Sequence, residues 1–89
     1  MDYAARFQLI VDSSVQKQLR PLPKRDAERI LSAIAELAVN PYSGDVIKMQ
    51  GEKDVWRRRV GSYRVFYEVL PREKIVHIFR VERRTSTTY

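Results

Sequence analysis

The hydrophobic periodicity of the chain changes near residue 40 from a helical to a strand pattern, and this change limits the folds that it can adopt. From Lys24 to about Val39, apolar residues recur at the i, i+3, i+4, i+7 spacing of an amphipathic helix, with charged residues on the other face. Pro23 precedes this segment and Asn40-Pro41 ends it. The middle of the chain is therefore predicted to form one long helix.

The second half of the chain shows the alternation and the β-branched and aromatic residues that are typical of strands. We expect strands over Val55–Val60, Tyr63–Leu70 and Lys74–Glu82, separated by turns at Gly61-Ser62 and Pro71-Arg72-Glu73. Strands joined by such short turns form an antiparallel meander.

The first part of the chain completes the predicted fold. Apolar residues at period two over Tyr3–Val11 predict an opening strand. Asp12, Ser13 and Ser14 are candidate N-caps for a short helix that ends at about Arg20, before two prolines. The two helices are expected to form a hairpin against which the sheet packs. The sequence thus predicts an α+β fold in the order β-α-α-β-β-β.

Length and composition exclude several classes of function. The 89 residues include no Cys and one His, so they offer no thiolate or imidazole cluster for a metal ion, and no metal or cofactor is expected. A chain this short buries only about 60–65% of its unfolded surface, which predicts a single domain over residues 1–89 without a deep cofactor cleft. No segment has the pattern of a signal peptide or a membrane span, which predicts a cytoplasmic protein.

The net charge of +6 is unevenly distributed. Residues 1–50 contain 7 basic and 6 acidic side chains, whereas residues 51–89 contain 10 basic and 5 acidic ones. A surface that faces a polyanion is therefore expected in the C-terminal half.

Three consecutive arginines lie in the first strand of the predicted meander. By strand alternation, Arg57 and Arg59 share one face, while Arg58 lies on the other face with Trp56. If Trp56 faces the core, Arg57 and Arg59 point outward, and Arg64 on the next strand can join them. Like charges placed together destabilise a sheet unless an anion lies between them, so this cluster suggests a phosphate site. The alternative is that exposed arginines only keep the surface soluble.

The last strand and the tail add basic and aromatic residues. Arg80, Arg83 and Arg84 precede a polar segment that ends in Tyr89. We treat Arg80 and Arg83 as candidate RNA-binding residues, because guanidinium groups beside an aromatic ring can hold an unpaired base and its phosphate.

Two segments carry a resemblance to a known family. Residues Val55–Val69 contain the pattern aromatic-Arg-x-Arg-Val-Gly-x-Tyr-Arg-Val-x-Tyr-Glu, and Ile78–Arg84 is followed by Tyr89 at the end of the chain. These segments resemble the RelE branch of the RelE/ParE toxins of toxin–antitoxin modules, and the resemblance covers nearly the whole chain.

The resemblance implies an α+β fold similar to that of microbial ribonucleases. It also implies a metal-independent endoribonuclease, an mRNA interferase that cuts codons in the ribosomal A site and so inhibits translation. It implies ribosome, mRNA and a cognate antitoxin as partners, the last in a complex that can be oligomeric. The RNA 2′-hydroxyl attacks the adjacent phosphate, and cationic groups stabilise the charge that develops. The family's catalytic positions fall here on the following residues: Arg57, Arg59, Arg64, Arg84 and Tyr89.

Two other functions stay open. ParE-type toxins share the fold and are implied to inhibit DNA gyrase by binding, although they generally lack the full set of catalytic positions. A non-catalytic RNA-binding homologue is the third reading. It stays open because arginine replaces lysine at positions 57 and 59 in comparison with some family members, and arginine cannot act as a general base.

Several residues can be interpreted as structural or as functional. Asp45 lies roughly where the related YoeB toxins carry a catalytic glutamate, but a lone loop carboxylate is more often a turn residue. His77 has no carboxylate partner that the sequence reveals, so a packed or edge histidine is favoured over a proton shuttle. Trp56, Tyr63 and Tyr67 are expected to pack, and Glu68 is expected to balance an arginine on its own strand face.

Overall fold

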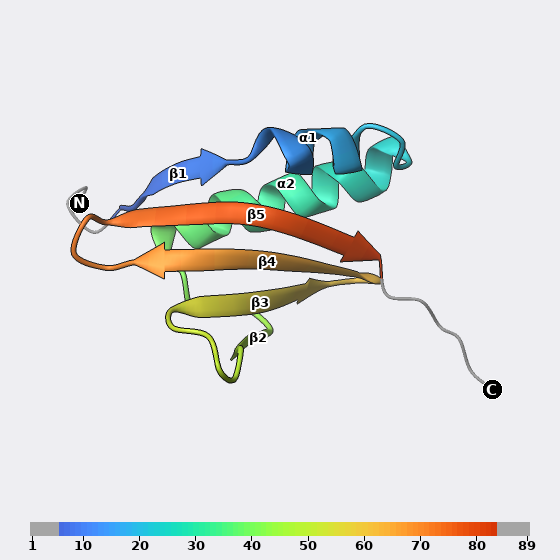
Figure 1. Cartoon of the computed structure of the whole chain (residues 1–89). Coiled ribbons are helices and arrows are strands. Elements are labelled where there is room, and N and C mark those ends of the chain that lie inside the picture. The colour runs from blue at the N-terminus through green and yellow to red at the C-terminus, as the bar shows by residue number, and fades with distance from the viewer. Residues whose placement is uncertain (1–5, 84–89) are drawn as a thin grey trace.

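The computed structural model describes residues 6–83. Figure 1 shows their strands and helices, which follow one another as β1 (Gln8–Val11), α1 (Ser13–Leu19), α2 (Lys24–Val39), β2 (Val46–Lys48), β3 (Val55–Val60), β4 (Tyr63–Leu70) and β5 (Ile75–Arg83). The predicted α+β class and the order of the predicted elements are confirmed. Tyr3 and Ala5, which the sequence places in the opening strand, lie outside the described residues.

The strands form one five-stranded sheet in the order β1-β5-β4-β3-β2. The predicted meander is confirmed, because β3, β4 and β5 pair antiparallel as neighbours. β1 adds a parallel strand beside β5, and α1 and α2 provide the crossover that a parallel pair needs. β2, which the sequence pattern does not predict, pairs antiparallel with β3 and has only three residues, too few for a periodic signal.

The core lies between α2 and one face of the sheet. Ile30, Ala33, Ile34 and Leu37 form the buried stripe of α2. Alternate residues of β4 and β5 face this stripe, and the main buried cluster consists of Val15, Leu19, Ile30, Ile34, Leu37, Tyr63, Val65, Tyr67, Val69, Val76, Ile78 and Val81. In Figure 1, α2 lies behind the sheet and no described helix covers the front. One sheet face is therefore buried and the other open.

The short helix α1 extends the edge of the sheet beyond β1. The Asp12 amide donates to the Ile78 carbonyl at 3.0 Å, and α1 begins at the next residue. One turn further on, the Gln18 side-chain oxygen accepts a hydrogen bond of 2.9 Å from the Val81 amide. α1 thus continues beside β5 where β1 ends. Within residues 6–83, neither helix is long and apolar enough to cross a bilayer.

Candidate phosphate-binding face

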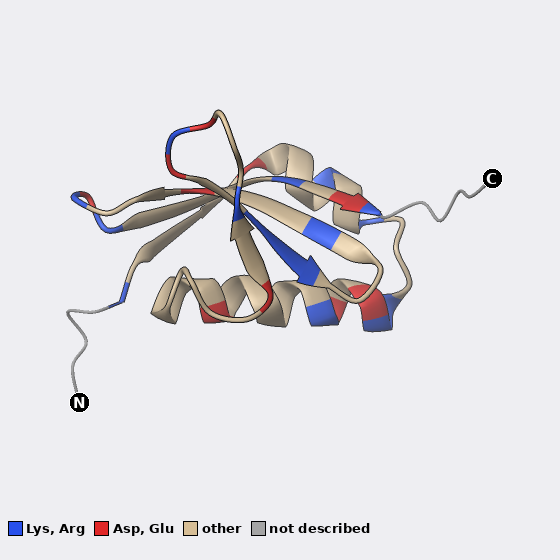
Figure 2. Cartoon of the chain, turned by 90° about the horizontal axis from the view of Figure 1, so that it is seen from below, with Lys and Arg blue, Asp and Glu red and all other residues tan. Residues whose placement is uncertain are grey.

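The open face of the sheet carries the arginines of β3, β4 and β5. Residues 64 and 66 of β4 alternate with Val65 and Tyr67, which face α2, and so lie on the open side. The strand register places this side's residues in two rows across the sheet, Arg59–Arg64–Glu82 and Arg57–Phe66–Arg80. Figure 2 shows the basic stretch of β3 in blue along the exposed strand. The structure therefore brings together four of the predicted residues: Arg57, Arg59, Arg64 and Arg80.

Two of these arginines are not held by a carboxylate within residues 6–83, although Glu82 is directly opposite Arg64 in the β4–β5 ladder. Within residues 6–83, neither Arg57 nor Arg64 forms an ion pair. Arg64 is also directly opposite Arg59, so two guanidinium-bearing side chains adjoin across the β3–β4 ladder. Like charges in this position repel each other. An anion between them would relieve this repulsion.

The other two arginines are held by neighbouring groups. Arg59 Nε donates to Asp45 Oδ2 at 2.9 Å, and both side chains are more than half exposed. Arg80 Nε lies 3.4 Å from Glu82 Oε2, and its guanidinium carbon lies 4.3 Å from the centre of the Phe66 ring. This stacking on Phe66 fixes the Arg80 side chain over the sheet. Asp45 thus belongs to the arginine cluster as well as to the segment before β2.

Arg58 lies on the opposite side of β3, as strand alternation predicts. Its side chain is only 13% exposed, and Nη2 forms an ion pair of 2.7 Å with Glu36 Oε1 of α2. Nη1 donates a long hydrogen bond of 3.5 Å to the Ala33 carbonyl, while Nε is buried and unpaired among the described residues. Arg58 therefore anchors the sheet to α2, and the clustered arginines are those at alternate positions.

Of the three other predicted residues, only Arg83 is described, and it does not join the cluster. Arg83 is opposite Tyr63, and its guanidinium carbon lies 5.9 Å from the centre of that ring. Tyr63 belongs to the buried face, so Arg83 is separated from the arginine rows. Arg84 and Tyr89 lie outside the described residues.

The aromatic residues of β3 and β4 that were expected to pack do so. Tyr67 is fully buried and donates a hydrogen bond of 2.6 Å to the Pro41 carbonyl, and burial raises the pKa of its phenol. Tyr63 donates to Asp26 Oδ2 at 2.8 Å, which raises the pKa of Tyr63. Trp56 packs against the core and meets the Tyr42 ring edge-on at 5.0 Å between centroids. These rings support the sheet from the side that faces α2.

His77 has two carboxylate partners that sequence reasoning missed. Its Nε2 lies 2.7 Å from Asp12 Oδ1, and its Nδ1 lies 3.6 Å from Glu68 Oε1. Asp12 is 65 positions away in the sequence, and only the parallel pairing of β1 with β5 brings it close. Asp12 precedes α1 but makes no side-chain cap there, because His77 engages its carboxylate. Glu68 was expected to balance an arginine, but its carboxylate faces His77 instead.

This arrangement predicts a pH-dependent contribution to stability. The hydrogen bond to Asp12 raises the pKa of His77 above its ordinary 6.5, although partial burial opposes the shift. A raised folded-state pKa means that the stabilisation is complete below the unfolded value and is lost as the pH rises through the folded value. We expect the unfolding free energy of the wild type, relative to that of His77→Gln, to fall as the pH rises from below 6.5 to well above it. Urea titrations test this, and parallel pH profiles for the two proteins would contradict it.

Comparison with known proteins places the chain in a family. Residues 7–87 match the family described as the ParE toxin of type II toxin-antitoxin systems, parDE. The protein named RelE1 of Methanocaldococcus jannaschii is 30% identical over 82 residues, which cover 89% of this chain and 91% of that protein. The chain therefore belongs to the RelE/ParE superfamily of type II toxin–antitoxin toxins.

Solved structures agree with this assignment. RelE in the archaeal RelE–RelB complex from Pyrococcus horikoshii is 31% identical, with a TM-score of 0.80 over 92% of this chain and 99% of that one. The isolated RelE toxin of E. coli has a TM-score of 0.78 over 91% of this chain and 87% of that one. Its identity is 20%, so it supports the fold alone. The sequence and structural relatives together indicate a RelE-type toxin.

Proposed function

We propose that this protein is a metal-independent endoribonuclease that cuts mRNA in the ribosomal A site. The observation that carries the proposal is the pair Arg57 and Arg64, which lie on the open sheet face without an ion-pair partner in residues 6–83. Guanidinium groups stay charged and donate two parallel hydrogen bonds, which suits the oxygens of a phosphate. The RelE-type relatives support the same function.

The proposed reaction needs positive charge at one phosphate. The RNA 2′-oxygen attacks the adjacent phosphorus, the bond to the 5′-oxygen breaks, and a 2′,3′-cyclic phosphate remains. The proton of the 2′-hydroxyl passes to a base, and the leaving 5′-oxygen takes up a proton. We assign the clamp on the scissile phosphate to Arg64 and Arg84, and the stabilisation of the developing charge to Arg57 and Arg59. Tyr89 is assigned to stacking on the nucleotide or to proton transfer.

The shape of the site favours a substrate that is positioned by another molecule. The arginines lie on an open sheet face that no described helix covers, so the described part of the chain does not enclose an RNA strand (Figure 1). Correct placement of reacting groups contributes a large part of catalysis, and here it must come from elsewhere. A ribosome that holds the codon in its A site supplies such placement.

We also propose a cognate antitoxin as the partner of this toxin. The structure from Pyrococcus horikoshii is that of a RelE–RelB complex. In this chain, residues 51–89 contain 10 basic and 5 acidic side chains, and an acidic antitoxin segment would complement that excess. Ribosome and antitoxin together imply action in the cytoplasm.

Inhibition of DNA gyrase is the second candidate function, because the matching family model is described as a ParE toxin. Purified protein incubated with programmed ribosomes, and in parallel with gyrase and plasmid, separates the two. We expect A-site cleavage and normal supercoiling. Inhibited supercoiling with intact mRNA would favour the ParE activity, and absence of both effects would favour a non-catalytic RNA-binding protein.

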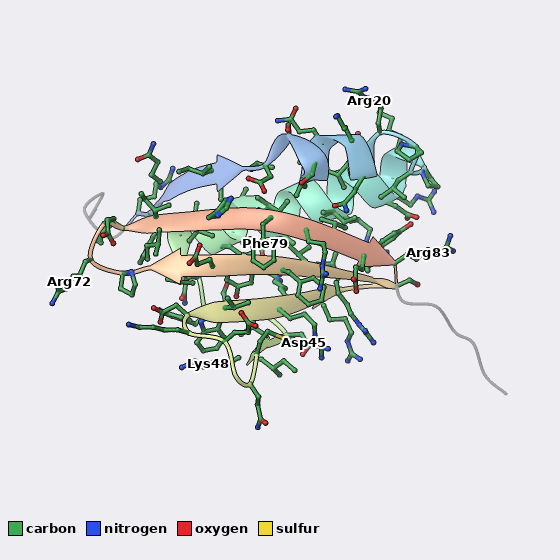
Figure 3. All side chains as sticks on the ribbon, viewed as in Figure 1. Arg20, Asp45, Lys48, Arg72, Phe79 and Arg83 are labelled. Carbon is green, nitrogen blue, oxygen red and sulfur yellow. The ribbon has the colours of Figure 1, made fainter. Side chains whose placement is uncertain are left out.

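The role of β3 in RNA binding predicts a change in salt dependence. Arg57→Ala with Arg59→Ala removes two phosphate contacts, so the slope of log K against log salt for single-stranded RNA should become about 1.4 less negative. The matched control is Arg20→Ala with Arg72→Ala, which removes the same charge from exposed positions outside the cluster (Figure 3). Equal slopes for the two double variants would rule out phosphate contacts by Arg57 and Arg59.

A further inference from the structure

A small cavity adjoins the arginine rows. It has a volume of about 250 Å³ and is lined by Met49, Glu52, Val55, Phe66, Phe79 and Arg80. Sites for drug-sized ligands usually measure about 300–1,000 Å³, so this cavity suits a group of one ring system. Arg80 belongs both to the cavity and to the arginine rows, and Phe66 is directly opposite Arg57 across the β3–β4 ladder. A ligand in the cavity would therefore lie beside the proposed phosphate site.

The aromatic wall of the cavity depends on an irregularity in β5. Phe66 pairs with Arg80 and Tyr67 pairs with Ile78, so Phe79 is an extra residue in the β4–β5 ladder. Such bulges redirect the side chain of the additional residue. Figure 3 shows Phe79 over the sheet on the face turned away from α2. Both phenylalanine rings thus line a cavity that opens beside Arg80.

The carboxylate that lines the cavity favours one kind of ligand. Glu52 is an exposed carboxylate from the segment before β3, and as a carboxylate it can only accept hydrogen bonds. A carboxylate recognises an amino group on the edge of a base and repels a carbonyl oxygen in the same place. Aromatic rings bind the flat faces of unpaired bases by stacking. Together these groups fit a planar ring with an amino group at its edge.

We propose that this cavity binds one unpaired RNA base with an exocyclic amino group, in preference to uracil, while Arg57 and Arg64 hold the phosphate. Phe79 stacks on the ring, the buried Phe66 with Arg80 stacked on it closes the inner end of the cavity, and Glu52 accepts a hydrogen bond from the amino group of the base. This inference rests on the proposed RNA-cleaving function and gives that function a base preference that the arginines alone cannot supply, because phosphate contacts carry no sequence information.

The test compares cytidine and uridine 5′-monophosphates, which differ at the base edge by an amino group and a carbonyl, with ribose 5-phosphate, which has no base. Amide chemical shifts of the labelled protein report each titration. We expect the cytidine compound to shift Val55, Phe66 and Phe79 and to bind about 2- to 10-fold more tightly than the uridine compound. Ribose 5-phosphate should shift Arg57 and Arg64 but not Val55 or Phe79.

Two variants test which side chains contact the base. Glu52→Gln should remove the difference between the two nucleotides, and Phe79→Ala should weaken nucleotide binding about 5- to 100-fold while ribose 5-phosphate binds as before. Leu31→Ala, which truncates a half-exposed apolar residue on α2, is the control and should change neither. Glu52 and Phe79 are not fully buried, so both variants should fold.

Different outcomes would contradict the base preference of the cavity and the phosphate site. If both nucleotides shift only the amides that ribose 5-phosphate shifts, or bind equally well, the cavity does not select a base, and the phosphate site stands. If none of the three ligands shifts Arg57 or Arg64, the proposed phosphate site is wrong, and the base preference that rests on it is withdrawn as well.

Discussion

Arg64→Ala should slow the cleavage of mRNA on programmed ribosomes by at least ~10²-fold, the scale of the loss when one transition-state donor is removed. Arg64 lies in the central strand of the β3–β5 meander, and within residues 6–83 its guanidinium group has no ion-pair partner. It is therefore available to a phosphate without breaking an existing contact. Tyr63 and Val65, the residues on either side of Arg64, are buried in the core, and the strand therefore fixes the position of Arg64.

Arg72→Ala is the matched control for this measurement. Arg72 is an exposed arginine in the turn between β4 and β5, and Figure 3 shows it at the end of the sheet opposite to Arg83. The variant removes the same charge and should cleave at nearly the wild-type rate. Single-turnover rates at saturating ribosome concentration separate the chemical step from binding. An unchanged rate for Arg64→Ala would remove Arg64 from the clamp.

Gly44→Ala should lower the free energy of unfolding by about 2–4 kcal/mol, from left-handed backbone strain and overpacking combined. Gly44 has a φ of +81°, and an added Cβ would lie 2.6 Å from Cζ of Arg58. The guanidinium group cannot easily move away, because it is mostly buried and bound to Glu36 at 2.7 Å. The methyl group would thus force the Arg58–Glu36 ion pair apart.

Gly51→Ala separates the two contributions to this effect. Gly51 has a φ of +80°, and no atom lies within 4 Å of the position of its added Cβ. Its substitution should cost only the backbone strain, about 1 kcal/mol. Urea titrations of both variants measure the difference. Equal losses of stability would mean that the close approach of Arg58 to Gly44 contributes nothing.

The arrangement of β3, β4 and β5 could be predicted from the sequence because each strand alternates clearly. Trp56 and Val60 lie on the same side as Arg58, so burial of these apolar residues fixes Arg57 and Arg59 on the open face. The helical spacing of apolar residues likewise predicts the bounds of α2, which lies between Pro23 and Pro41. These features depend on local patterns, which sequence reasoning captures well.

Other features depend on contacts between distant segments. Asp12 reaches His77 only because β1 adds to the sheet parallel to β5, and a parallel pairing leaves no local signal. Asp45 reaches Arg59 because the three-residue strand β2 pairs with β3. The bulge at Phe79 gives no signal in the sequence either. It adds one residue to β5 relative to β4, and the added residue is apolar like most of the strand.

The central claim is that the open arginine face contacts RNA, and arginine modification by phenylglyoxal tests it most directly. Mass spectrometry of protein bound to programmed ribosomes should find Arg57, Arg59 and Arg64 protected relative to free protein, while Arg20 and Arg72 react equally in both states. Modification of Arg57, Arg59 and Arg64 that is as complete on the ribosome as in free protein would contradict the claim.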